Sequence, residues 1–194
     1  MDADWSVELG VDDSTLEVPW ASPDGRLQFV DLRAHPQELD KLEEVRRYPE
    51  MGEFLRAVNG PSAQLSSAKC DVWESEEIEP AEEIFGGTHK VGSYCDVILD
   101  RDRLSFAKQE AFAKRVAELL RRSPWIPAST ELVMRRCLFR KAEEAASGFC
   151  ITCFVVGYGK GRDAALRQWR IALHLVSNAL LQTSLECNSP AQTQ

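Results

Sequence analysis

The sequence contains no apolar run long enough to cross a membrane. Its most apolar stretch, residues 171–181, is interrupted by His174, Ser177 and Asn178 and falls short of the roughly 20 residues that a spanning helix needs. Residues 1–15 are acidic and lack the basic segment with which a secretory signal begins. We therefore expect a soluble, cytoplasmic protein that makes no contact with a membrane.

Patterns typical of catalytic and metal sites are also missing. His35, His89 and His174 are scattered without the spacing of a metal site, and no GxSxG nucleophile turn is present. Cys150 and Cys153 have CxxC spacing, but their apolar surroundings predict a strand, in which residues three apart point to opposite faces. We expect no metal and no cofactor, and the sequence leaves open whether the protein is an enzyme.

The six cysteines do not predict a disulfide framework, because no secretory signal accompanies them. In apolar strands cysteine behaves as a small hydrophobic residue. Cys187, in the polar tail, is expected to be the most exposed thiol. Five are expected to be buried free thiols: Cys70, Cys95, Cys137, Cys150 and Cys153.

Acidic and basic residues are distributed unevenly along the chain. Residues 1–100 carry 23 acidic and 8 basic residues, a balance of −15, whereas residues 101–194 carry 8 and 15, a balance of +7. Such asymmetry is typical of an acidic part that covers a basic part, in the same molecule or in a neighbouring subunit. The simpler alternative is that the charges coat exposed helices.

The N-terminal part, residues 1–60, is interpreted as an extension that packs on the rest. Residues 1–25 contain several chain breakers and predict irregular structure, and residues 27–32 predict a short strand. A helical stripe follows Pro36, and a second short helix ends at Asn59-Gly60. Residues 184–194 form a polar tail that is expected to be disordered.

Residues 61–183 contain one pattern twice, two strands followed by a helix (ββα). The first copy covers residues 64–122 and the second covers residues 131–182. Two such units predict an α+β fold, with an antiparallel sheet of four or more strands and both helices on one face.

The opposite face of that sheet is a candidate binding surface. The predicted alternation along the strands places two acids, two arginines and two aromatic residues there: Asp71, Trp73, Tyr94, Asp96, Arg136 and Arg140. This combination suits a polar ligand or a protein partner. The alternative is an ordinary solvated sheet face.

A glycine-rich turn is the second candidate site. It follows a predicted strand and opens a helix, where free backbone N–H groups and the helix dipole favour an anion. The alternative is a strand-to-helix turn with Asp163 as N-cap. The candidate ligand-binding residues are Gly157, Gly159, Lys160, Gly161 and Arg162.

The acidic segment 74–83 connects the first two predicted strands. We expect it to dock on basic groups, because like charges crowded in one loop favour a cationic surface. The candidate basic groups are Arg135, Arg136, Arg140 and Arg162. The alternative is a mobile, solvated loop without a fixed partner.

Two function classes remain open at this point. The first is a non-catalytic binding or protein-interaction module, whose partner is another protein or a second copy of the chain. The second is a small enzyme or ligand-binding protein that holds an anionic group at residues 157–162. Nucleic acid is not an expected partner, because the net charge is −8 and an acidic segment lies beside the candidate sheet face.

Overall fold

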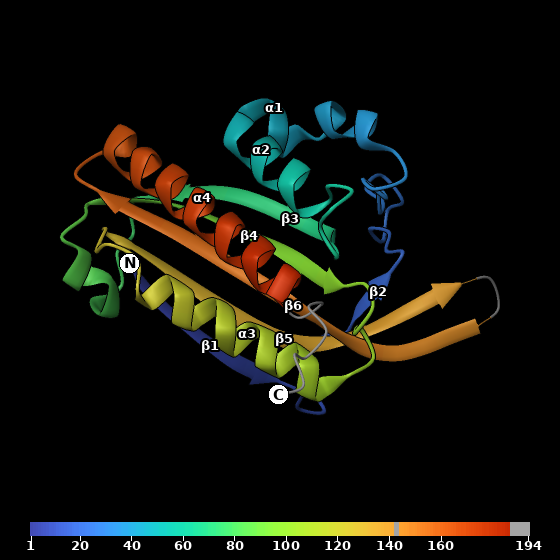
Figure 1. Cartoon of the computed structure of the whole chain (residues 1–194). Coiled ribbons are helices and arrows are strands. Elements are labelled where there is room, and N and C mark those ends of the chain that lie inside the picture. The colour runs from blue at the N-terminus through green and yellow to red at the C-terminus, as the bar shows by residue number, and fades with distance from the viewer. Residues whose placement is uncertain (142–143, 187–194) are drawn as a thin grey trace, which may run out of the picture.

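The computed structural model describes residues 1–141 and 144–186 (Figure 1). Cys187 and the rest of the predicted tail lie outside the described residues, except that residues 184–186 belong to the last helix. The elements are β1 (Asp2–Glu8), β2 (Leu16–Val18), η1 (Pro36–Lys41), α1 (Glu43–Arg47), α2 (Pro49–Val58), β3 (Leu65–Ser75), η2 (Pro80–Phe85), β4 (His89–Leu99), α3 (Phe106–Arg121), β5 (Ala128–Lys141), β6 (Glu144–Gly159) and α4 (Arg162–Glu186).

The strands form one mixed, six-stranded sheet that is mostly antiparallel. β3, β4, β6 and β5 are antiparallel neighbours in that order. Both β1 and β2 pair in parallel with the other edge of β5. The α+β class and the antiparallel core of the sheet are therefore confirmed, and the N-terminal segment adds two strands to it.

The N-terminal segment differs in detail from its prediction. Residues 1–25, expected to be irregular, contain β1 and β2, whereas residues 27–32 form no strand; Gln28 makes one isolated bridge with Ala21. In β1, the buried Ala3 lies between exposed acidic residues. Because acidic residues are uncommon in strands, the sequence did not indicate a strand here. The two predicted short helices correspond to η1 with α1 and to α2.

α3 and α4 lie side by side on one face of the sheet, and α2 packs on α4 (Figure 1). Ser105 opens α3, since its side chain accepts a hydrogen bond from the Lys108 N–H. Between helices and sheet lies the main hydrophobic core, with Phe112, Leu132 and Trp169 fully buried in it. Within residues 1–141 and 144–186, no helix has both the length and the apolar character needed to cross a membrane.

Among the described residues, the N-terminal segment covers one end of the opposite face of the sheet. There a second, smaller core contains Cys137, Phe139 and Cys150, and the N-terminal segment packs Val18 and Phe29 against it. The face as a whole lies away from α3 and α4 (Figure 1). The N-terminal segment therefore acts as a partial cover of this face, on which Trp73, Tyr94 and Phe154 are half-buried.

Ion pairs join the acidic and basic parts of the chain within one molecule. Among residues 1–141 and 144–186, five of them connect an acid from residues 1–100 to an arginine further along the chain. The pairs are Asp4–Arg121, Glu8–Arg135, Glu17–Arg140, Glu74–Arg162 and Glu50–Arg170. In the fold, acidic side chains from the N-terminal half of the chain thus form ion pairs with arginines from the C-terminal half.

Candidate binding surfaces

Four of the predicted sheet-face residues share the face that lies away from the helices. Asp71 and Trp73 on β3 and Tyr94 and Asp96 on β4 point there, because the alternate residues of both strands belong to the core beneath the helices. The register places Asp71 opposite Tyr94, and Tyr94 opposite Phe154 of β6. We call this surface, with Phe154 included, the open face.

Aromatic side chains form a row across the middle of the open face. Trp73 covers Gly92, where a Cβ would lie 2.8 Å from the Trp73 Nε1. Tyr94 and Phe154 have their ring centroids 6.0 Å apart, and the Arg135 guanidinium lies 5.6 Å from the Phe154 ring. All three aromatic residues of the row are half-buried. The open face therefore presents apolar surface from three adjacent strands, bordered by charged groups.

Asp96 is the buried charged group of this face, with 6% of its surface exposed. The Thr152 hydroxyl donates a 2.5 Å hydrogen bond to its carboxylate. Burial raises the pKa of Asp96, and the hydrogen bond from Thr152 and the charges of Arg135 and Lys69 oppose this shift only in part. The carboxylate is thus held in a setting that disfavours its charge.

The two arginines predicted for this face lie elsewhere. Arg136 donates to two carbonyl oxygens of the loop after β1, and Arg140 forms a two-pronged ion pair with Glu17 at 2.9 and 3.0 Å. Arg135 is the arginine beside the open face, where it lies within 3.5 Å of the Thr152 hydroxyl and pairs with Glu8. Arg135 and Arg136 point to opposite faces of β5, and Arg135 is the one that lies on the side of the open face.

The glycine-rich turn places β6 close against α4. A Cβ at Gly157 would lie 2.6 Å from the Cα of Trp169, and one at Gly159 would lie 2.7 Å from the Cβ of Ala164. Gly161 adopts a φ of +92°, which other residues rarely adopt, and its N–H donates to the Thr88 hydroxyl at 3.3 Å. The glycines thus have packing and turn roles that need no ligand.

The two charged side chains of the turn, Arg162 and Lys160, differ in their contacts. The Arg162 guanidinium binds both carboxylate oxygens of Glu74 at 2.7 Å, and this contact lowers the pKa of Glu74. Tyr48 also donates to Glu74, at 2.7 Å. Lys160 is exposed to solvent. An anion at this turn would therefore meet Lys160 and compete with Glu74 for Arg162.

The acidic segment 74–83 is docked on the end of the sheet. Besides the pair between Glu74 and Arg162, Glu82 accepts hydrogen bonds from Lys90 at 2.7 Å and from the Tyr158 hydroxyl at 2.9 Å. Just beyond the segment, Phe85 stacks on the Tyr158 ring with centroids 4.3 Å apart. Of the four basic partners that we expected, Arg162 makes the contact.

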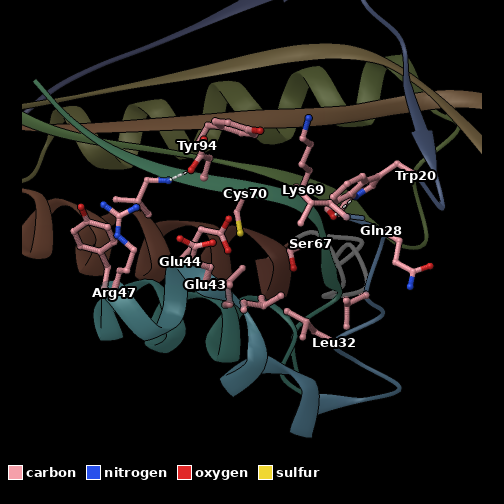
Figure 2. Close-up of a pocket in the computed structure, with 18 residues that line it drawn as sticks. Trp20, Gln28, Leu32, Glu43, Glu44, Arg47, Ser67, Lys69, Cys70 and Tyr94 are labelled. Carbon is pink, nitrogen blue, oxygen red and sulfur yellow. Dashed lines mark hydrogen bonds between the residues drawn. The ribbon is translucent and has the colours of Figure 1, made fainter. Parts of the chain in front are cut away.

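A groove of about 480 Å³ runs beside the outermost strand β3 (Figure 2). Residues 67–72 of β3 form one wall, α1 forms the second, and the N-terminal segment with Trp20 forms the third. The side chains of Glu44 and Cys70 point toward one another across it (Figure 2). Burial, with a smaller contribution from Glu44, raises the pKa of the Cys70 thiol to about 12.

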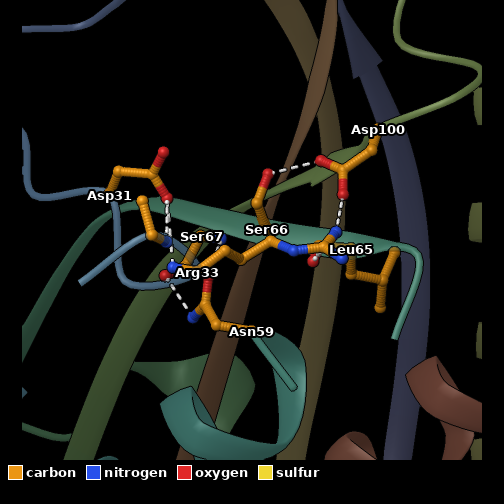
Figure 3. Close-up of polar contacts among 8 residues, drawn as sticks. Asp31, Arg33, Asn59, Leu65, Ser66, Ser67 and Asp100 are labelled. Carbon is orange, nitrogen blue, oxygen red and sulfur yellow. Dashed lines mark hydrogen bonds and ion pairs between the residues drawn. The ribbon is translucent and has the colours of Figure 1, made fainter. Parts of the chain in front are cut away.

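A polar cluster ties the N-terminal segment to the start of β3 (Figure 3). Arg33 forms an ion pair with Asp100 and donates to the Leu65 carbonyl oxygen at 3.3 Å. Asp100 also accepts a 2.6 Å hydrogen bond from Ser66. On the helix side, the Asn59 Oδ1 accepts from the backbone N–H of Ser67 at 3.0 Å. These contacts hold one end of the groove in place.

Sequence reasoning missed several residues of these surfaces. Phe154 and Thr152 lie in a continuous apolar run, in which no alternation indicates the residues that face outward. The walls of the groove come from segments far apart in the sequence, so no local pattern marks them. Comparison with known protein families, curated proteins and solved structures found no match to this chain.

Proposed function

We propose that this protein is a non-catalytic binding module that holds a protein partner on its open face. The observation that carries the proposal is the half-buried row of Trp73, Tyr94 and Phe154 on the face away from the helices. Aromatic residues are enriched at interfaces and among their hot spots, where they contribute large apolar contacts. Arg135 and Asp71 beside the row supply the charged border that such surfaces carry.

We also propose that the core of the protein is a duplicated ββα unit. Asp71 pairs with Tyr94 in the first hairpin and Glu131 pairs with Phe154 in the second, so both counterparts lie 60 residues further along (71 to 131 and 94 to 154). The same offset relates the buried residues of α3 to buried residues of α4: Gln109, Phe112, Ala113, Val116, Ala117 and Leu120 correspond to Trp169, Ala172, Leu173, Val176, Ser177 and Leu180.

The offset of 60 residues also identifies the centre of the open face. Tyr94 and Phe154 are counterparts in the two units and are also direct partners between β4 and β6. A twofold relation between the units would therefore pass between these two rings. The partner surface is built around this pair.

Affinity capture with matched variants tests the binding function. Tagged wild type, Tyr94→Ala, Phe154→Ala and the control Trp125→Ala, whose indole is 70% exposed, are used as baits after thermal melting has shown that each is folded. We expect a protein retained by the wild type and the control to be lost by both face variants. With that protein purified, affinity should fall about tenfold or more, as for interface hot spots. Equal affinity for all four baits would refute the open face as the contact surface.

A ligand-binding function at residues 157–162 is the alternative, and it rests on the exposed Lys160 at the start of α4. Melting temperature is measured against nucleotides, sugar phosphates and carboxylates, since a ligand that binds the folded state raises it by mass action. A rise that Lys160→Ala removes would favour this alternative. Sedimentation of the isolated protein shows whether the partner on the open face is a second copy.

A further inference from the structure

The backbone at the start of β3 is already capped on its outer side. The Asp100 N–H donates to the Gln64 carbonyl, so Gln64 faces β4. Alternation then directs Leu65 and Ser67 away from β4, and their outer backbone groups are met by Arg33 and Asn59. β3 is the outermost strand of the sheet, and side chains replace a neighbouring strand along this part of it.

The capping changes at a bulge in the middle of β3. The register shifts by one residue between Ser67 and Cys70, and the Trp20 indole N–H donates to the Ala68 carbonyl at 2.7 Å within this bulge. The shift changes which backbone groups face outward. Beyond it, the backbone of Cys70, Val72 and Glu74 points away from β4, toward the side on which the groove lies. Of these, the Val72 N–H donates to the Asp71 carboxylate at 2.7 Å.

The groove combines an apolar floor with acidic groups that lack ion-pair partners. Leu42 and Leu55 contribute to the floor. Glu43, Glu44 and Asp71 line the groove and form no ion pair within the part of the chain that the structure describes. The two basic residues of the groove are held over aromatic rings: Lys69 lies 5.5 Å from the Trp20 ring and Arg47 lies 5.5 Å from the Tyr48 ring.

We propose that this groove binds an extended peptide of a partner protein, which adds to β3 as a further strand and places a lysine or arginine beside Glu43, Glu44 and Asp71. The outward backbone groups of Cys70 and Glu74 supply sequence-independent hydrogen bonds, and the floor takes every second side chain of the added strand. This site lies at the outer edge of β3 and goes beyond the proposed function, although Asp71 and Tyr94 border both the groove and the open face.

The dimensions of the groove favour a peptide over a second copy of the chain. Its volume of about 480 Å³ lies in the range of small-ligand clefts. A stable protein–protein interface instead buries about 800 Å² on each partner. α1 and the segment around Trp20 line the groove together with β3, so a partner must reach the strand between these walls, as a single extended segment can.

Peptide selection on the purified full chain tests the proposal. Displayed random decapeptides are enriched on the wild type, and the best is synthesised for fluorescence anisotropy. We expect alternating apolar residues with at least one lysine or arginine. The double variant Glu43→Lys/Glu44→Lys should weaken binding tenfold or more. The control Glu77→Lys/Glu83→Lys reverses the charge of two exposed acids and should leave binding unchanged. Methylation of alternate peptide amides should abolish binding.

Amide hydrogen exchange adds a readout that does not depend on the variants. The bound peptide should slow exchange at Cys70 and Glu74. Failure to enrich any peptide, equal affinity of both double variants, or full binding of the methylated peptide would each overturn the proposal. A concentration-dependent dimer that Glu43→Lys/Glu44→Lys abolishes would overturn it as well, since a second copy would then occupy the edge.

Discussion

Gly157 lies directly against the backbone of Trp169, so that a Cβ at position 157 would stand 2.6 Å from the Trp169 Cα. Trp169 is fully buried, and its indole N–H donates to the Ser93 hydroxyl at 3.0 Å. The absence of one side chain on β6 thus permits the close packing of α4 on the sheet.

We expect Gly157→Ala to lower the free energy of unfolding by about 3 kcal/mol, the upper part of the range for overpacked cores, because the helix backbone itself must move. Urea denaturation measures the change. Gly86→Ala is the control: Gly86 has a φ of +63° with nothing within 4 Å of a new Cβ, so the conformational cost is about 1–2 kcal/mol. Equal losses in the two variants would contradict the packing role of Gly157.

Asp96 predicts a pH dependence of stability. Its folded pKa is raised above the ordinary value of 3.8, so the folded protein binds this proton more tightly than the unfolded chain does. Stability from this group is therefore lost as pH rises from about 4 toward and beyond the folded pKa. Each tenfold difference in proton affinity corresponds to about 1.4 kcal/mol.

The variant Asp96→Asn removes this titration and keeps an oxygen that accepts from Thr152. Its stability relative to the wild type should rise between about pH 3 and about pH 7, as measured by urea unfolding at each pH. The acidic end of the series serves as the internal reference, because Asp96 is then protonated in both states. A difference between variant and wild type that stays constant across this range would be evidence against a buried, destabilised carboxylate.

The contact between Glu74 and Arg162 predicts that salt controls the docking of the acidic segment. Both side chains are partly exposed, so screening weakens their attraction. Hydrogen exchange in residues 74–83 should be slow at low salt and faster at high salt. Arg162→Ala should give fast exchange at both salt concentrations, whereas Arg167→Ala, an exposed arginine one turn further along α4, should behave as the wild type. Protection that survives Arg162→Ala would show that this pair does not hold the segment.

Thiol reactivity tests the environment of the groove. Cys70 is half-exposed with a pKa of about 12, whereas Cys95 and Cys153 are buried beneath the helices. Because the thiolate is the reactive form, alkylation of Cys70 by iodoacetamide should be slow at neutral pH and rise about tenfold per pH unit. Peptide mass spectrometry follows each site separately. Rapid labelling of Cys70 at neutral pH, or labelling of Cys95 before it, would disagree with this description.

Beyond the N-terminal strands, the sequence indicated most of the local elements. The ββα pattern in residues 64–122 indicated β3, β4 and α3, and Asn59-Gly60 marked the end of α2. For the open face, the assignment of Asp71 and Tyr94 to one side needed only the period of two along each strand. Such patterns are visible because each depends on neighbours within a single element.

The face of β5 was the instructive exception. Cys137 and Phe139 are buried, and their apolar character led us to place them beneath the helices, with Arg136 on the opposite side. They face the other way, because the N-terminal segment covers them there. A strand buried on both faces does not reveal by hydrophobicity alone which face meets the helices. Arg135 consequently borders the open face.

From residue 36 onward, the sequence by itself indicated where strands and helices form and where glycine opens a turn, whereas β1 and β2 were not foreseen. Only the tertiary structure decided that β1 pairs with β5 across more than a hundred residues, that Tyr94 meets Phe154, and that Trp20 and α1 enclose the edge of β3. Periodicity is a property of one element and its immediate solvent exposure. Strand partners and groove walls depend instead on competition among all apolar surfaces of the chain, which is settled when they pack together.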